Sequence, residues 1–241
     1  MGPVTDPAQP KRVGIVCGLA SEATVIRRAF EAVGGAPQYE LAVSGADAAC
    51  AEAAATKLTE AGVDALVSAG LCGGLAPQLR IGDLVRCANV TDATTGTHYT
   101  ANPWRPVATT AKNAPRCHEG TIIGSDEAIL TVADKTSAFA RTGALAVDME
   151  SHALAKVAAR ARVPFFVLRA VIDDATMALP PFLGRITSPS GHPRHVALAA
   201  ELIRRPRYLP NVIALARASG RAHRALEAGA RQLAAALQED R

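Results

Sequence analysis

The chain has 241 residues, which suffices for one large α/β domain or two small ones. Hydrophobic residues make up 49% of it and aromatic residues only 4%, so its core must be built from aliphatic side chains and alanine. The last 41 residues hold eight arginines and four acidic residues and so carry the whole net charge of +4, a local basic charge that argues against a protein whose body binds nucleic acid.

Strands and helices are expected to alternate along the first half of the chain. A buried strand is predicted over residues 12–18 and a helix over 19–33, with Glu22 in the first turn of that helix. Residues 70–74 are rich in glycine and predict a turn. Further strands are expected at 39–44, 63–69 and 82–90, and a further helix at 46–61.

The second half continues the alternation after a long excursion at residues 91–119, a kind of loop that is often functional. The run at 165–172 is apolar except for Arg169, which is typical of a strand buried on both faces. A loop is expected at 178–193. Strands are also predicted at 120–124 and 145–147, and helices at 131–142, 151–162, 195–204, 209–218 and 221–237.

This alternation predicts an α/β fold with three layers, α/β/α, around a doubly wound sheet. We expect residues 12–241 to form a single domain, in which 178–241 supply closing helices and a basic tail. The first eleven residues, 1–11, are polar and contain prolines, so we expect them to be disordered and to hold no secretory signal.

Acidic residues stand at two predicted strand ends. Asp148 and Glu150 follow the strand at 145–147, and Asp173 and Asp174 close the strand at 165–172. Because ligands bind at the carboxyl ends of strands in an open parallel sheet, the two pairs are expected to meet at one edge. For Asp148 and Glu150 a role in the first turn of the following helix is the alternative. A carboxylate at the end of a buried strand, such as Asp173, needs a partner or a ligand.

The cysteines favour a cytoplasmic protein without a bound metal. Their number is five and they form no CxxC pair, which is typical of a reducing compartment and not of a zinc site. Cys72 is interpreted as a buried thiol, with a nucleophile as the alternative. His192 and His195 are interpreted as surface residues, with metal ligation as the alternative. No apolar run is long enough to span a membrane.

Several dispersed motifs resemble a known enzyme family. They are VDMES at 147–151, VLRAVIDDA at 167–175, GLASE at 18–22, AGLCGGL at 69–75 and IGSD at 123–126. Together they make residues 12–175 similar to the nucleoside phosphorylase and nucleosidase superfamily, in the manner of methylthioadenosine/S-adenosylhomocysteine nucleosidases. ALPP at 178–181 and RRPRYLPNVIALAR at 204–217 resemble the hopanoid-associated phosphorylase subfamily, which is linked to removing adenine from adenosylhopane.

The resemblance implies a purine nucleoside phosphorylase-like fold whose mixed sheet partly closes into a distorted barrel. It also implies an enzyme that cleaves the N-glycosidic bond of an adenosine derivative without a cofactor. Asp173 would donate a proton to N7 of adenine, with Asp174 as the alternative acid. Glu150 would bind the 2′ and 3′ hydroxyl groups of ribose, and Met149 would pack beneath the sugar.

Glu22 separates two chemistries. Phosphorolytic relatives have an arginine four residues after the first-strand glycine, here Gly18, and this chain has Glu22, as hydrolytic relatives do. The resemblance therefore favours hydrolysis with Glu22 as the base toward water, and helix capping is its alternative role. Gly70 would allow close approach of the backbone to the ligand. Leu71 stands where hydrolytic relatives have serine, and the backbone near Ile129 would read the adenine edge.

Alternatives and partners complete the expectations. Phosphorolysis with phosphate as cosubstrate, a methylthioadenosine/S-adenosylhomocysteine nucleosidase, and a nucleoside-binding module without turnover are the alternatives. The resemblance implies a homodimer or a higher homo-oligomer. The basic tail suits either packing on the sheet or contact with the inner membrane face, where a hopanoid lipid would lie.

Overall fold

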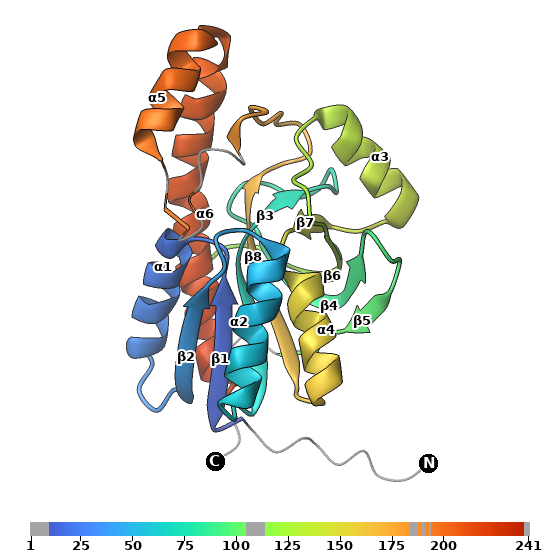
Figure 1. Cartoon of the computed structure of the whole chain (residues 1–241), viewed down its shortest axis with the longest axis vertical. Coiled ribbons are helices and arrows are strands. Elements are labelled where there is room, and N and C mark those ends of the chain that lie inside the picture. Colours follow the sequence, from blue (N-terminus) through green and yellow to red (C-terminus); the bar gives the residue numbers. More distant parts are fainter. Residues whose placement is uncertain (1–9, 105–113, 184–187, 189–190, 193, 239–241) are drawn as a thin grey trace.

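The fold is known from a computed structural model, which describes residues 10–104, 114–183, 188, 191–192 and 194–238. Strands and helices alternate around one mixed sheet, and the expected α/β class is confirmed (Figure 1). The strands are β1 (Arg12–Cys17), β2 (Gln38–Val43), β3 (Ala65–Gly74), β4 (Leu84–Asp92), β5 (His98–Thr100), β6 (Cys117–Gly124), β7 (Ala146–Asp148) and β8 (Phe165–Asp173). The helices are α1 (Ala20–Glu31), α2 (Ala48–Glu60), α3 (Val132–Thr142), α4 (Ser151–Ala161), α5 (His195–Arg204) and α6 (Leu209–Ala236), with a short 3₁₀ turn, η2 (Pro206–Tyr208).

The sheet closes on itself over part of its width. Strand β3 pairs in parallel with β1 and β8 and antiparallel with β7. Strand β8 also pairs antiparallel with β4, β4 pairs with β6, and β6 pairs with β7. The path from β3 through β8, β4, β6 and β7 therefore returns to β3 as a small barrel, while β1 and β2 extend the sheet as an open wing. This closure brings the ends of β3, β7 and β8 together.

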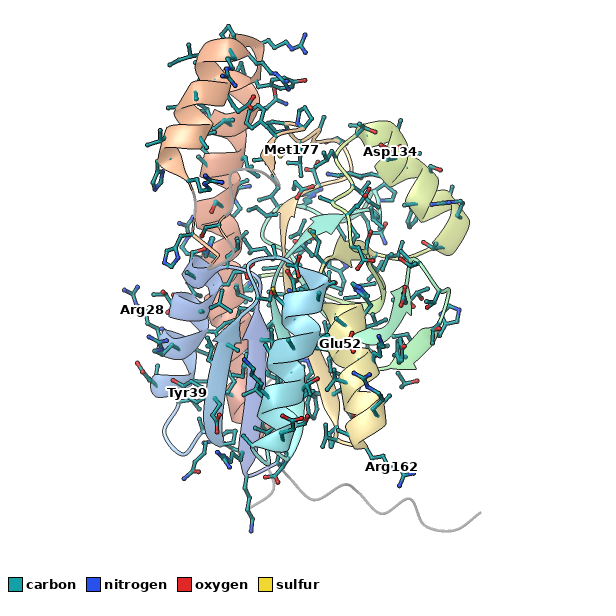
Figure 2. All side chains as sticks on the ribbon, viewed as in Figure 1. Arg28, Tyr39, Glu52, Asp134, Arg162 and Met177 are labelled. Atoms are coloured by element: carbon teal, nitrogen blue, oxygen red, sulfur yellow. The ribbon has the colours of Figure 1, made fainter. Side chains whose placement is uncertain are left out.

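Two aliphatic layers cover the sheet. Helices α2 and α4 bury residues such as Ala55 and Leu154 against one face, and α1 and α6 bury Ile26 and Leu226 against the other (Figure 1). Charged residues such as Arg28 and Arg162 stay on the outer surface (Figure 2). The composition predicted this kind of core, since few aromatic side chains are available to fill it.

The turn expected at residues 70–74 was wrong. Strand β3 runs on through these glycines and pairs with β8 and β7. Their lack of side chains serves close packing: a Cβ at Gly70 would lie 2.6 Å from Nη1 of Arg169 and 2.9 Å from a carboxylate oxygen of Glu22. The excursion at 91–119 was also wrong in part, because it contains β5 and the first residues of β6. Within it, residues 105–113 lie outside the described part of the chain.

The two closing helices expected at 209–218 and 221–237 form one helix of 28 residues, α6. Gly220 does not interrupt it, because a helical glycine costs only about 1 kcal/mol and the buried side chains of Leu226 and Leu233 offset that cost. The expectation of disorder at residues 1–11 falls mostly outside the described residues, as does part of the loop expected at 178–193.

Helix α5 and the first half of α6 stand away from the body as an arm (Figure 1). None of the residues of α5 is buried. The exposed large hydrophobic side chains on this arm are Val196, Ile203, Leu209 and Ile213, with Val196 and Ile203 more than 80% exposed. None of the helices described is both long and apolar enough to cross a membrane.

Two glycines of α6 give a matched test of this packing. A Cβ at Gly229 would lie 2.9 Å from side-chain atoms of Leu168 and Leu84, whereas one at the exposed Gly220 would meet only Arg224, at 3.7 Å. Gly229→Val should therefore lower the free energy of unfolding by about 1–3 kcal/mol through overpacking. Gly220→Ala, the control, should raise it by about 1 kcal/mol. Urea unfolding measures both, and a stability loss with Gly220→Ala would contradict a continuous α6.

Candidate active site

A pocket of about 230 Å³ opens at the carboxyl ends of β1, β3, β7 and β8. Its wall combines apolar side chains with four buried carboxyl groups, those of Glu22, Asp148, Glu150 and Asp173. Larger hollows lie near residues 33–38, at the amino ends of the strands, where the ion pair of Arg12 and Glu40 is about 40% exposed. The convergence of buried acids marks the smaller pocket as the candidate active site.

A buried arginine compensates the acids on one side of this pocket. The side chain of Arg169 is 1% exposed, and its Nε lies 2.5 Å from Oδ2 of Asp148 while its Nη2 lies 3.3 Å from Oε2 of Glu150. Its Nη2 also donates hydrogen bonds to Oγ of Ser68 at 2.5 Å and to Oγ of Ser151 at 3.1 Å. Burial opposes its charge, but the carboxylates around it raise the pKa of Arg169, so it stays cationic.

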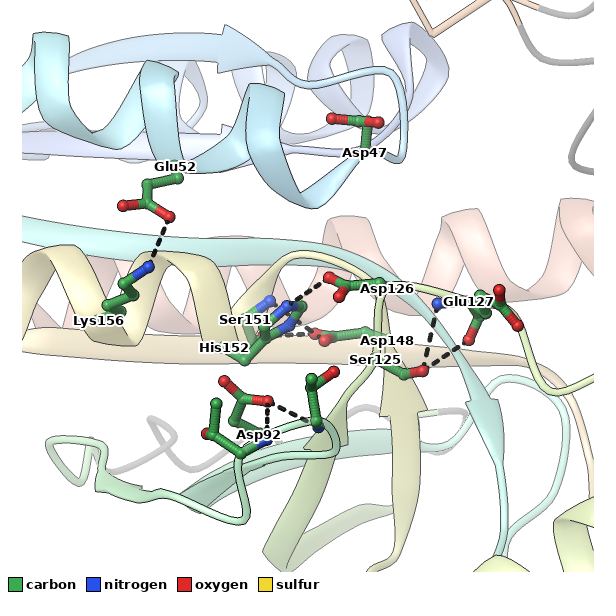
Figure 3. Close-up of polar contacts among 12 residues, drawn as sticks. Asp47, Glu52, Asp92, Ser125, Asp126, Glu127, Asp148, Ser151, His152 and Lys156 are labelled. Carbon is green, nitrogen blue, oxygen red and sulfur yellow. Dashed lines mark hydrogen bonds and ion pairs between the residues drawn. The ribbon is translucent and has the colours of Figure 1, made fainter.

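Asp148 does more than favour the start of a helix. Its carboxylate accepts a hydrogen bond from the backbone N–H of Ser151 at 3.1 Å and another from the Ser151 hydroxyl (Figure 3). The same carboxylate contacts Arg169. Asp148 thus joins the beginning of α4 to the middle of β8 and fixes the backbone that carries Glu150. Figure 3 also shows the neighbouring contact of His152 with Asp126, at 3.1 Å.

Glu150 lies directly at the pocket wall. Burial raises its pKa to about 8, the charges of Asp148 and Glu22 act in the same direction, and Arg169 acts against them. Its Oε1 lies against the backbone of Gly18, where an added Cβ would come within 2.5 Å. The glycine at the end of β1 therefore leaves the space that Glu150 occupies.

Of the two roles that the sequence left open for Glu22, helix capping is seen in the structure, and the role as a base toward water stays a prediction. Its Oε2 accepts a hydrogen bond from the backbone N–H of Leu19 at 2.8 Å, which caps α1, and its Oε1 accepts one from the N–H of Leu71 at 2.8 Å. Burial raises the pKa of Glu22 despite these bonds and the charge of Arg169. A buried carboxyl group with a raised pKa is suited to accept a proton near neutral pH.

Asp173 has a partner that the sequence analysis missed. The ammonium group of Lys135, on α3, contacts its Oδ2, and both side chains are buried. Burial raises the pKa of Asp173, and Lys135 acts in the opposite direction. A weak signal was present in the sequence, since Lys135 lies three residues before the buried Ala138 and so shares its helix face.

The other expected site residues divide into two groups. Met149, Leu71 and Ile129 line the pocket. Gly70 lies behind its wall, against Glu22 and Arg169, and is not part of the lining. Asp174 is likewise outside the lining, and its Oδ1 accepts hydrogen bonds from the N–H and the hydroxyl of Thr176 at 3.0 and 2.7 Å.

Cys72 is a thiol in this environment, because burial raises its pKa well above the ordinary value. This matches the interpretation of a buried thiol and leaves little thiolate for nucleophilic chemistry. Among the described residues, no group of three or more His, Cys, Asp and Glu side chains is arranged to hold a metal ion.

Comparisons with known proteins concern the family and the fold of the chain. The family model of the phosphorylase superfamily matches residues 33–182, more than half of the chain. The fold is similar to that of 5′-methylthioadenosine/S-adenosylhomocysteine nucleosidase from Neisseria meningitidis in complex with methylthio-immucillin-A, with a TM-score of 0.67 and 16% identity over 93% of this chain and 99% of that one.

Two Helicobacter pylori proteins are further structural neighbours. One is 5′-methylthioadenosine/S-adenosyl homocysteine nucleosidase, with a TM-score of 0.65 and 17% identity over 95% of this chain and 99% of that one. The other is a mutant of futalosine hydrolase, with a TM-score of 0.55 and 20% identity over 67% of this chain and 89% of that one. At these identities the likeness concerns the fold.

Because Glu150 is buried, we expect the free energy of unfolding to depend on pH. Its folded pKa of about 8 lies above the ordinary value of 4.5, so the stability it contributes is fully present below pH 4.5 and is lost as the pH rises toward 8. Glu150→Gln removes that loss, and the variant should exceed the wild type by roughly 2–4 kcal/mol at pH 8 and equal it near pH 4.5. Urea unfolding across this range measures the difference.

The control is Glu60→Gln, because Glu60 is exposed at the end of α2. Its difference from the wild type should stay close to zero at every pH. A Glu150→Gln variant that is less stable than the wild type at pH 8 would show that Glu150 is ionised and well paired in the free protein.

Proposed function

The chain belongs to the phosphorylase superfamily and is an enzyme of that family, and we propose that it cleaves the N-glycosidic bond of an adenosine derivative and releases adenine. The superfamily was expected from the sequence motifs and is confirmed, whereas the hopanoid-associated subfamily stays a prediction. One observation carries the proposal: Glu22, Glu150 and Asp173 converge, all buried, on one pocket at the carboxyl ends of the strands.

Each acid has a role that its position suits. Cleavage of the glycosidic bond builds positive charge on the sugar and negative charge on the base, as in glycoside hydrolysis. Asp173, with a pKa raised by burial, protonates the departing adenine at N7. Glu150 receives the ribose hydroxyl groups, and Met149, on the same pocket wall, packs beneath the sugar. The backbone near Ile129 contacts the adenine edge.

Glu22 favours hydrolysis over phosphorolysis. The backbone N–H groups of Leu19 and Leu71, which could otherwise bind an anion, already donate to its carboxylate. A phosphate held about 4 Å from that carboxylate would be repelled by roughly 4 kcal/mol per unit charge at an effective dielectric constant of about 20. We therefore assign Glu22 as the base that accepts a proton from water. Leu71 provides only its backbone N–H there, because its side chain replaces the serine of hydrolytic relatives.

The proposed substrate is adenosylhopane, an intermediate of hopanoid biosynthesis. Support comes from the motifs at 178–181 and 204–217 and from the apolar side chains of Leu179 and Leu183, which line the pocket on the side of the arm. Methylthioadenosine or S-adenosylhomocysteine is the second candidate, because the structural neighbours from Neisseria meningitidis and Helicobacter pylori are named for these substrates. The chemistry proposed for the three acids is the same in either case.

The arm suits contact with an anionic membrane surface. It exposes Val196, Ile203 and Arg204, and the exposed Arg194 and Arg207 lie just before and just after α5. Apolar side chains flanked by arginines are typical of segments that lie on anionic lipid. We propose that the protein is cytoplasmic and binds the inner membrane face through this arm when it takes a hopanoid lipid. We also propose that it acts as a homodimer or a higher homo-oligomer. Light scattering would measure the mass of that assembly.

Product analysis tests the reaction. The protein should release adenine from adenosylhopane in buffer without phosphate and leave a free ribosyl product, because Glu22 activates water. Glu22→Gln should lower kcat by about 10²–10⁴-fold, since the glutamine side chain cannot accept the proton. The control Glu60→Gln should keep the wild-type rate.

Release that requires phosphate and yields a ribose 1-phosphate product would contradict the role of Glu22. Release from methylthioadenosine but not from adenosylhopane would contradict the hopanoid substrate.

Vesicle sedimentation tests the arm. The wild type should bind vesicles that contain phosphatidylglycerol and should bind vesicles of pure phosphatidylcholine weakly. Replacing Val196 and Ile203 together by serine should weaken binding by tenfold or more, since each large apolar side chain is worth roughly 1.5–3 kcal/mol when buried. Val132→Ser, at an exposed position on α3, is the control and should bind as the wild type does. A wild type that stays in solution with anionic vesicles would contradict membrane contact.

A further inference from the structure

Lys135 is a cation buried in the interior of the protein beside the candidate active site. Its side chain is fully buried, and its ammonium group contacts Oδ2 of Asp173 and donates hydrogen bonds of 2.8 Å to the backbone carbonyls of Asp174 and Met177. Three acceptors therefore use all three of its N–H groups. A lysine without solvent and with every donor satisfied has a fixed position, unlike the flexible lysines of a surface.

These contacts join two sides of the pocket. One side is the connection from β6 to α3, which carries Ile129 and ends in the Thr131 cap of α3. The other is the end of β8 with the segment that follows it, which carry Asp173 and Leu179 respectively. A backbone hydrogen bond from the N–H of Leu179 to the carbonyl of Leu130, at 2.8 Å, is a second link between them. Asp134 and Met177, labelled in Figure 2, lie at the same end of the molecule.

The two oxygens of Asp173 are not equivalent. Oδ2 receives the ammonium group, whereas Oδ1 accepts no hydrogen bond from the residues that the structure describes. Because Asp173 lines the pocket, Oδ1 is the oxygen left for a ligand. Burial raises the pKa of Asp173, so the carboxyl group holds a proton more firmly than an exposed aspartate does, while the Lys135 charge keeps that proton available.

We propose that Lys135 is the positioning residue of the acid step: it holds Oδ2 of Asp173, directs Oδ1 toward the leaving base and compensates the carboxylate that forms when the proton leaves. This inference rests on the proposed function and deepens it. As the glycosidic C–N bond breaks, its electron pair goes to the base, and the base takes the proton from Oδ1 of Asp173. The O–H electron pair stays on Asp173 as a carboxylate that faces Lys135. Water gives its proton to Glu22 and its oxygen to the anomeric carbon, and solvent exchange resets both acids.

The Lys135 ammonium is a fixed charge beside the negative charge that develops on Asp173, and such a charge stabilises the transition state strongly in an interior that excludes water. A purely architectural role for Lys135, as a tie between α3 and residues 174–177, is the competing explanation. The two differ in which reactions they affect. The positioning role concerns only leaving groups that must be protonated, whereas a loosened pocket would impair every substrate.

Two substrates with the same sugar separate these explanations. One is the adenosine derivative, and the other is a riboside with the same 5′ substituent and 4-nitrophenol as its leaving group, which departs as a stable anion without an acid. Lys135→Met and Lys135→Gln should lower kcat for adenine release by roughly 10²-fold and leave kcat for nitrophenol release within about threefold of the wild type. Asp173→Asn should show the same selective loss, and Asp174→Asn should not.

The pH profile provides a second readout. Activity on the adenosine derivative requires protonated Asp173 and falls as the pH rises through its pKa. Removal of the Lys135 charge should move this alkaline fall to higher pH, because an opposing charge no longer lowers that pKa. Lys156→Met is the matched control, since Lys156 lies on the exposed side of α4 and pairs with Glu52 (Figure 3). It should change neither the rates nor the profile.

The outcomes are distinct. Equal losses on both substrates in a folded Lys135 variant, or no loss on either with an unchanged pH profile, would overturn the inference. Two neutral variants are used so that either one, if folded, decides the question. If the wild type releases no base from any adenosine derivative, the proposed function itself is wrong. If the wild type is active but its Lys135 variants show no selectivity between the two substrates, only the inference about Lys135 is wrong.

Discussion

The charge of Arg169 is the constraint on which the rest of the site depends. It lies in the middle of a strand that is otherwise apolar, and it is fully enclosed. An unpaired charge in such a place would cost several kcal/mol, so the surrounding chain must supply compensation. Asp148 provides it from the turn between β7 and α4, and Glu150, Ser68 and Ser151 contact the same guanidinium group. The arginine therefore fixes the turn that presents Glu150 to the pocket.

Charge balance then explains the state of the acids. Three carboxyl groups, those of Asp148, Glu150 and Glu22, lie around the cation Arg169. The excess negative charge, together with burial, raises the pKa values of Glu22 and Glu150. Asp173 lies on the other side of the pocket with a cation of its own, Lys135. The pocket thus has two separate acid–cation groups, which suits a reaction that takes a proton at one side and gives one at the other.

Small residues make this arrangement sterically feasible. The backbone at Gly18 gives room to Glu150, and the backbone at Gly70 gives room to Glu22 and Arg169. Closure of the sheet through β8 and β4 brings the ends of β3, β7 and β8 to one place, so residues far apart in the chain meet there. The same closure leaves the arm of α5 and α6 outside the body, beside the segment that carries Leu179 and Leu183.

The sequence by itself determined the α/β class, the strand–helix–strand unit that carries Glu150 and Asp173, and the position of Glu22 in the first turn of a helix, because hydrophobic periodicity and motif spacing are local properties of the chain. It could not place Lys135 against Asp173, show that Asp174 caps a turn at Thr176, or reveal that Arg169 unites the acids. The turn predicted at the glycines of β3 and the break predicted in α6 at Gly220 were both wrong. These features were decided only by the tertiary structure, since they depend on contacts across the closed sheet, where burial and charge compensation outweigh local preference.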